Sequence, residues 1–145
     1  MVIAIYALIL AIIFWIDLRY RLILDKIVYP AMVLALALSL LPGGIGWQSS
    51  LIGGMAGFLP MLLVFILSRD GMGFGDVKLA ALIGLMVGFP LIIIALPLSF
   101  IVGSIVSIIL LINKKELSYK VPFGTLLTVS TLFTLFLKVP LWISL

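Results

Sequence analysis

The sequence has 145 residues, of which 66% are hydrophobic and only 10% are charged, and its formal net charge is +4. This composition excludes an intrinsically disordered chain and is too apolar for an ordinary soluble domain. The lack of cysteine and histidine excludes a disulfide framework, a thiolate zinc site, and serine–histidine or cysteine–histidine catalytic pairs. We expect a single small membrane domain over residues 1–145, with no metal site and no cofactor.

Apolar runs separated by breaks predict an all-α membrane protein, a polytopic bundle of six transmembrane helices. The first run has no basic residue before it and no small-residue cleavage site after it, so we expect a retained span with its N-terminus outside. The predicted spans lie at about residues 2–20, 27–41, 50–68, 77–87, 91–112 and from about 123 into the C-terminal region.

The segment Gly88-Phe89-Pro90 divides the fourth span from the fifth. A single helix over residues 77–112 would measure roughly 54 Å at about 1.5 Å per residue, whereas the hydrocarbon core is about 30 Å thick. Two spans that turn at residues 88–90 are therefore the better interpretation. The fourth span is then short, so we expect Asp76 at its start to lie beneath the inner surface, in a cleft that water can enter.

The distribution of charge predicts which loops face the cytoplasm. Every basic residue except Lys138 falls in the first, third or fifth connection or at its edges, which agrees with the positive-inside rule. The outer loops at 42–49 and 88–90 carry no charge. We expect the net charge to reflect topology and lipid contact, not nucleic-acid binding. The charged residues expected inside are Asp17, Arg19, Arg21, Asp25, Lys26, Arg69, Asp70, Asp76, Lys78, Lys114, Lys115, Glu116 and Lys120.

Small and hydroxyl side chains indicate how two of the spans pack. Gly53 and Gly57 form a small-xxx-small face, which we expect to serve packing within the chain, with dimerisation as the alternative. The hydroxyl residues of the sixth span are expected to make backbone or interhelical hydrogen bonds and not a ligand site. These residues are Thr125, Thr128, Ser130, Thr131 and Thr134.

Two acidic residues beside predicted spans are the candidate catalytic groups. Asp17 lies near the end of the first span, and Asp76 ends the glycine-rich break at 71–76. An acid at a membrane span is costly, which marks both as functional candidates. Because the chain has no histidine or cysteine, the most economical mechanism for peptide hydrolysis uses two carboxylates and a water molecule. We predict that Asp17 and Asp76 meet at the cytoplasmic edge of the bilayer as an aspartyl pair.

Neighbours of the two acids are candidates for binding substrate or shaping the site. Gly73 and Gly75 allow positive φ and close backbone approach, which would let an extended substrate pair beside the acids. Asp25 is close enough to help position substrate, although a loop or cap role is the simpler interpretation. Lys78 could favour the anionic form of Asp76, and it could equally serve as a topology anchor alone.

Three separated motifs resemble those of a known family. The segment Gly73-Phe74-Gly75-Asp76 resembles the Gly-x-Gly-Asp signature of type IV prepilin peptidases and the related preflagellin peptidases. Residues 17–27 resemble the first catalytic loop of that family, with Leu24 where a proline is usual. Residues 121–124 resemble the Pro-Phe-Gly that opens its last span, which adds Pro122 and Gly124 to the candidate site-shaping residues. The three motifs, in this order and on a six-span plan, extend the resemblance over nearly the whole chain.

The resemblance implies an intramembrane aspartyl endopeptidase of a prokaryotic cell membrane. Such enzymes remove the short basic leader of prepilin-like or preflagellin precursors at the cytoplasmic face, and Asp17 and Asp76 correspond to their catalytic pair. Many bacterial relatives carry a further N-terminal region with four cysteines and also methylate the new N-terminus. Because this chain has neither that region nor a cysteine, we expect a minimal form with peptidase activity alone.

Proteins of other classes are the alternatives. Presenilin-type and signal-peptide-peptidase-type proteases also use Gly-x-Gly-Asp, but they have more spans and a Tyr-Asp pair where this chain has Ile16-Asp17. A small polytopic transporter, or an assembly subunit of a pilus or secretion system, would use its acids to bind protons or partners. A transporter needs acids near the middle of the bilayer, whereas all five acids here are expected at one edge.

Overall fold

The computed structural model describes residues 1–20, 23–68, 72–112 and 123–143. This described part consists of helices joined by turns and contains no strand. The predicted all-α class is confirmed, and one helix overlaps each predicted apolar run. In chain order these are α1 (Val2–Tyr20), α2 (Asp25–Ser39), α3 (Trp47–Leu67), α4 (Phe74–Val87), α5 (Ile92–Ile112) and α6 (Phe123–Ile143).

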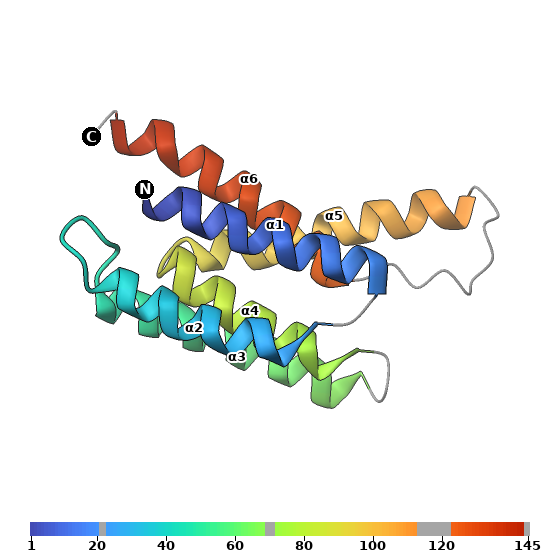
Figure 1. Cartoon of the computed structure of the whole chain (residues 1–145). Helices are drawn as coiled ribbons and strands as arrows, with labels where there is room; N and C mark the ends of the chain where they lie inside the picture. The colour runs from blue at the N-terminus through green and yellow to red at the C-terminus, as the bar shows by residue number, and fades with distance from the viewer. Residues whose placement is uncertain (21–22, 69–71, 113–122, 144–145) are drawn as a thin grey trace.

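The helices alternate in direction along the bundle (Figure 1). The C-terminal ends of α1, α3 and α5 lie at one end of the bundle, together with the N-terminal ends of α2, α4 and α6. The N-terminal end of α1 and the C-terminal end of α6 lie at the opposite end, with the α2–α3 and α4–α5 connections. Asp17, late in α1, and Asp76, early in α4, therefore belong to the same end.

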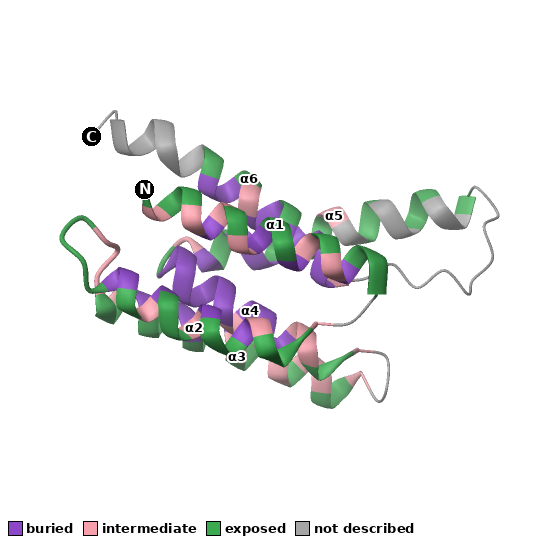
Figure 2. Cartoon of the chain, viewed as in Figure 1, coloured by how far each residue is buried: buried purple, intermediate pink, exposed green. Residues whose placement is uncertain are grey.

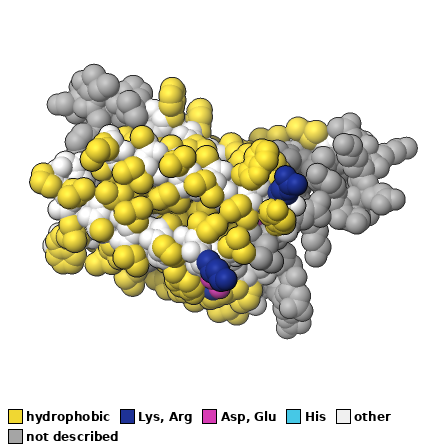
Figure 3. Space-filling view, viewed as in Figure 1, with side chains coloured by type: hydrophobic (Ala, Val, Ile, Leu, Met, Phe, Trp, Pro, Cys, Tyr) yellow, Lys and Arg dark blue, Asp and Glu magenta, His cyan; other side chains and the backbone are white. Residues whose placement is uncertain are grey.

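The side of the bundle is covered by exposed apolar side chains. Figure 3 shows them across most of one face, with basic and acidic side chains gathered near one end. Trp15, Leu63 and Ile66 are each about 60% exposed or more, and monomeric soluble proteins rarely expose large contiguous apolar patches. Within the described residues, α1 and α3 are long and apolar enough to cross a membrane. Length and composition thus support two of the predicted spans directly.

Helix α4 is the buried centre of the bundle. It has only 14 residues, and six consecutive ones, Leu82–Val87, are all buried, so no face of its C-terminal half is open (Figure 2). It packs against α2, α3, α5 and α6. A helix that is apolar all round suits such a position. The prediction of a short fourth helix is confirmed, although it begins at Phe74, three residues before the predicted span starts.

Glycines bring α3 and α4 into backbone contact. A Cβ on Gly53 would collide with the carbonyl oxygen of Gly84, and a Cβ on Gly57 would collide with that of Ala80. The predicted packing of the Gly53–Gly57 face within the chain is confirmed. Because Gly53 and Gly57 lie so close to α4, a side chain at either position would force the two helices apart.

The connection from α4 to α5 is the predicted turn at residues 88–90. Gly88 adopts φ 75°, a left-handed conformation that disfavours residues with a side chain. The turn is bound to the start of α3, because the Phe89 N–H donates to the Ser49 carbonyl at 3.1 Å and the Ser49 hydroxyl donates to the Phe89 carbonyl at 2.9 Å. Residues 77–112 are therefore two helices and not one.

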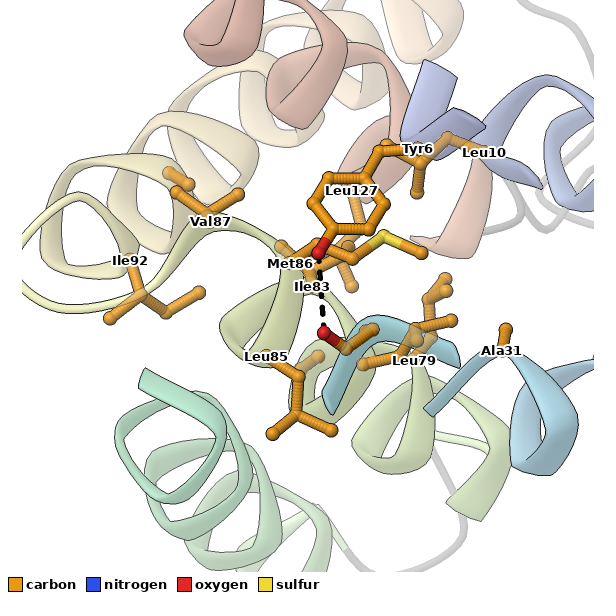
Figure 4. Packing of buried hydrophobic residues seen from close by; sticks show 14 of the residues in the cluster. Tyr6, Leu10, Ala31, Leu79, Ile83, Leu85, Met86, Val87, Ile92 and Leu127 are labelled. Atoms are coloured by element: carbon orange, nitrogen blue, oxygen red, sulfur yellow. Dashed lines mark hydrogen bonds between the residues drawn. The ribbon is translucent and has the colours of Figure 1, made fainter. Parts of the chain in front are cut away.

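Helix α1 is tied to the rest of the bundle through buried contacts. The Tyr6 hydroxyl donates to the Ala35 carbonyl of α2 at 3.3 Å, and Figure 4 shows this bond beside Met86 of α4 and Leu127 of α6. Tyr6 and Leu10 are almost completely buried. These contacts fix the position of α1, and with it the position of Asp17.

The buried hydroxyls of α6 make the predicted backbone and interhelical hydrogen bonds. Thr128, Thr131 and Thr134 donate to carbonyls of their own helix at 2.6–2.8 Å. Ser130 also contacts Ser99 of α5. The Thr125 hydroxyl makes an interhelical bond as well, and its partner is an acid on α1.

Candidate active site

Asp17 and Asp76 lie close together at one end of the bundle, so that their charges interact. Asp17 is in the last turns of α1 and is only 4% exposed. Asp76 is partly buried in the first turn of α4, at the N-terminal position predicted for it. Residues 59 positions apart in sequence (76 − 17) are thus brought to one place. The predicted convergence of the two acids agrees with this geometry.

The first turn of α6 binds both acids. The Thr125 hydroxyl donates to Oδ2 of Asp17 at 2.8 Å, and the Thr125 backbone N–H also donates to Asp17. The Gly124 backbone N–H donates to Asp76. The first N–H groups of a helix have no partner within the helix, so they are available for such bonds. Consecutive residues of one helix therefore hold the two carboxyl groups.

Close packing around the acids depends on two glycines and on Ile23. A Cβ on Gly124 would lie 2.8 Å from Oδ2 of Asp17 and 3.1 Å from Cδ1 of Ile23. A Cβ on Gly75 would lie 3.0 Å from Cβ of Ile23. The Ile23 side chain, in the connection between α1 and α2, thus packs against the starts of both α4 and α6. Gly75 and Gly124 allow this approach.

The positive φ that glycine allows is not used at Gly73 or Gly75. Gly73 is extended, with φ −79° and ψ 142°, and Gly75 lies within α4. Among the described glycines, positive φ occurs at Gly43, Gly46 and Gly88. The helix begins earlier than the glycine pattern indicated, so Gly75 is used for close approach and not for a turn.

Lys78 forms an ion pair with Asp25. Its ammonium group donates to Oδ1 of Asp25 at 2.9 Å and lies 5.1 Å and 5.2 Å from the ring centroids of Tyr29 and Phe74. The pair links α4 to α2 at the same end of the bundle as the acids. Asp25 is the first residue of α2, so it belongs to a helix and not to a loop.

Some predicted residues lie outside the described part of the chain. Pro122 is one of them. The others are the loop charges Arg21, Arg69, Asp70, Lys114, Lys115, Glu116 and Lys120.

Two residues at the site were not predicted from the sequence. The sequence predicts a backbone or interhelical hydrogen bond for Thr125 but not a place at the site. The available signal was its position directly after the Pro-Phe-Gly motif. Ile23 is one more apolar residue in an apolar chain, and nothing in the pattern distinguishes it.

The arrangement is suited to acid–base chemistry. Two carboxyl groups whose charges interact do not both ionise freely, so they tend to share one proton and to titrate as a pair. One member can then accept a proton while the other donates one. Within the described residues, no group of three or more acidic, histidine or cysteine side chains is clustered as a metal site requires.

Comparison with known proteins identifies similar sequences. A model of the type IV leader peptidase family matches residues 4–108. Proteins named prepilin leader peptidase/N-methyltransferase are 32% identical over 122 residues in Aeromonas hydrophila and 30% identical over 121 residues in Pseudomonas aeruginosa. These alignments cover 80% and 79% of this chain but 42% of each relative, so the chain spans less than half of their length. No solved structure matches the chain.

Proposed function

This chain belongs to the type IV leader peptidase family, and we propose that it is an aspartic endopeptidase with Asp17 and Asp76 as its catalytic pair. Its substrates are prepilin-like or preflagellin precursors, from which it removes a short basic leader. The observation that carries this proposal is the proximity of the two carboxyl groups, each bonded to the first turn of α6. The matched family segment contains both acids.

In the proposed reaction, a water molecule attacks the scissile carbonyl carbon. One carboxylate takes a proton from the water, and the other carboxyl group donates its proton to the carbonyl oxygen. The tetrahedral intermediate then breaks its C–N bond as a proton passes to the leaving amine. The products are a free carboxyl group on the leader and a free amine on the mature protein, and the pair again holds one proton.

The residues around the acids are proposed to receive the substrate. Gly73 is exposed and extended, so its backbone can pair with an extended segment near the scissile bond. Gly75 and Gly124 keep the backbones close to the acids. Asp25, with a side chain 54% exposed, is a candidate contact for the basic leader. Lys78 orients Asp25 through the ion pair, and Pro122 is proposed to shape the start of α6.

We propose that residues 1–145 form one six-span domain in the cell membrane of a prokaryote. The N-terminus lies outside and the acids face the cytoplasm. The alternating helix directions, the lipid-compatible sides and the basic residues expected in the connections near the acids support this topology. Lipid is then a partner of the apolar surface. Nucleic acid is not expected to bind.

The proposed activity is peptide cleavage without N-methylation. The resemblance associates methylation with a cysteine-containing element, and this sequence contains no cysteine. Mass spectrometry of the mature N-terminus after cleavage tests this point. A mass increase of one methyl group, dependent on S-adenosylmethionine, would contradict it.

Co-expression with a prepilin-like precursor tests the peptidase function. The wild-type chain should release the leader, and Asp17→Asn and Asp76→Asn should each abolish release at equal amounts in the membrane. Substitution by asparagine keeps the shape of each side chain and removes its acid–base function. Cleavage that survives in either variant would reject the pair. A wild-type chain that leaves the precursor intact would favour a transporter or assembly subunit.

A further inference from the structure

The hydroxyl of Thr125 has no part in the proton transfers described above. We propose that Thr125 is a positioning residue, which holds the Asp17 carboxyl group in the orientation required for reaction with Asp76. This inference rests on the proposed peptidase function.

Thr125 makes two contacts with one acid. Its hydroxyl donates to Oδ2 of Asp17 at 2.8 Å and its backbone N–H donates to the same side chain. Both residues are buried, with 8% of Thr125 and 4% of Asp17 exposed. Two donors from a single residue fix the rotation of a carboxyl group as well as its position. Hydrogen bonds to an acid group are also stronger than those between neutral groups.

The position of Thr125 in α6 explains why its hydroxyl is free to make this contact. Thr128, Thr131 and Thr134 satisfy their hydroxyls on carbonyls of the preceding turn. Thr125 lies in the first turn of α6, which begins at Phe123. Its hydroxyl instead reaches across to α1.

Gly124, the residue before Thr125, holds the second acid, Asp76, in a similar way. The Gly124 N–H donates to Asp76, so one helical turn contacts both members of the pair. The backbone of that turn sets the spacing between α1 and α4 at the site. Of the groups in this turn that bind the acids, the Thr125 hydroxyl is the one that a substitution can remove without changing the backbone.

Kinetics of the full chain in detergent distinguish positioning from packing. Thr125→Val removes the hydroxyl and keeps the shape, so kcat for leader release should fall about 10- to 100-fold while KM changes little. Thr125→Ser keeps the hydroxyl and should retain kcat within about threefold of wild type. A packing role predicts the reverse, because valine preserves the volume and serine does not.

Thr131→Val is the matched control. Thr131 is also buried on α6, but its hydroxyl bonds to the Leu127 carbonyl at 2.6 Å. Its kcat should remain within about threefold of wild type. If Thr125→Val does not accumulate in the membrane, Thr125→Ala compared with Thr125→Ser measures the loss of the same hydroxyl.

The two proposals fail in different ways. If Thr125→Val is as active as wild type while Asp17→Asn and Asp76→Asn are inactive, the positioning role is wrong and the peptidase function stands. An equal loss in Thr125→Ser and Thr125→Val also overturns the positioning role. If Asp17→Asn is itself active, the peptidase proposal fails first.

Discussion

Gly124 at the start of α6 lies against the carboxyl group of Asp17 in α1, and a Cβ at Gly124 would be 2.8 Å from Oδ2 and 3.2 Å from Cγ of that group. These are the separations of a steric clash. The contact explains why glycine occupies this position beside Thr125, since any side chain would displace the carboxyl group or the helix.

Gly124→Ala should therefore reduce leader cleavage by at least about tenfold, because small displacements of reacting groups are costly. The measurement is kcat of the purified full chain, with thermal stability recorded in parallel. Gly73→Ala is the comparison, since a Cβ there would be 4.0 Å from the nearest atoms and should leave thermal stability unchanged. An active Gly124→Ala variant would mean that α6 can shift without disturbing the acids.

Gly53→Ala and Gly57→Ala should each destabilise the protein by about 1–3 kcal/mol, the usual cost of overpacking. A methyl group at either position would meet a backbone carbonyl of α4, which cannot rotate away. Thermal unfolding in detergent checks this. Met55→Ala on the exposed face of α3 is the control and should change stability by less than about 0.5 kcal/mol. Unchanged stability in both glycine variants would contradict the close contact.

Cleavage should have a bell-shaped dependence on pH. The reactive form of the pair holds one proton, so activity is lost at low pH when both acids are protonated and at high pH when both are ionised. The test is to measure kcat between about pH 4 and about pH 9. The peptide segment around the scissile bond should be uncharged, so that the substrate does not titrate in this range. A rate that rises to a plateau with a single transition would indicate that one acid acts alone.

Asp25→Asn should raise KM for a precursor with a basic leader and leave kcat nearly unchanged, because Asp25 is proposed to contact the leader and not the scissile bond. Lys78→Met is the matched control, since it removes the same ion pair but keeps the acid. A precursor whose leader has glutamine in place of its basic residues should be insensitive to Asp25→Asn. Equal effects of both variants on KM would assign the role to the ion pair itself.

Leu24→Pro should be tolerated and should stabilise the chain by about 0.4–1 kcal/mol. Leu24 has φ −76° and ψ 117°, a conformation that proline also adopts, and its carbonyl still accepts the N–H groups of Ile27 and Val28 after substitution. Thermal unfolding and kcat provide the check. A loss of stability would show that the connection before α2 needs the leucine N–H or side chain.

The helices were predictable from the sequence because their signals are local. Charged and glycine-rich breaks in an apolar chain mark the ends, and α1 has the predicted bounds Val2–Tyr20. The turn at Gly88 followed from comparing helix length with bilayer thickness. The start of α4 was predicted three residues late, because Phe74 and Gly75 read as part of the glycine-rich break although both are helical.

The site was predictable only where a motif or a rare residue type marked it. Asp17 and Asp76 stand out because acids are scarce in this chain. The bond from Thr125 to Asp17 joins residues 108 positions apart, and it depends on how α6 packs against α1. The pairing of Lys78 with Asp25 likewise depends on the packing of α4 against α2. Such contacts are decided by tertiary structure and leave no periodic pattern.

The buried position of α4 has a consequence for how the enzyme would respond to its surroundings. The C-terminal half of α4 is in contact with protein on every face, so the acyl chains of the bilayer do not contact this part of the helix that carries Asp76. Changes in acyl-chain length would be absorbed by the outer helices through tilt. Turnover should then vary little between vesicles of short-chain and long-chain phospholipids.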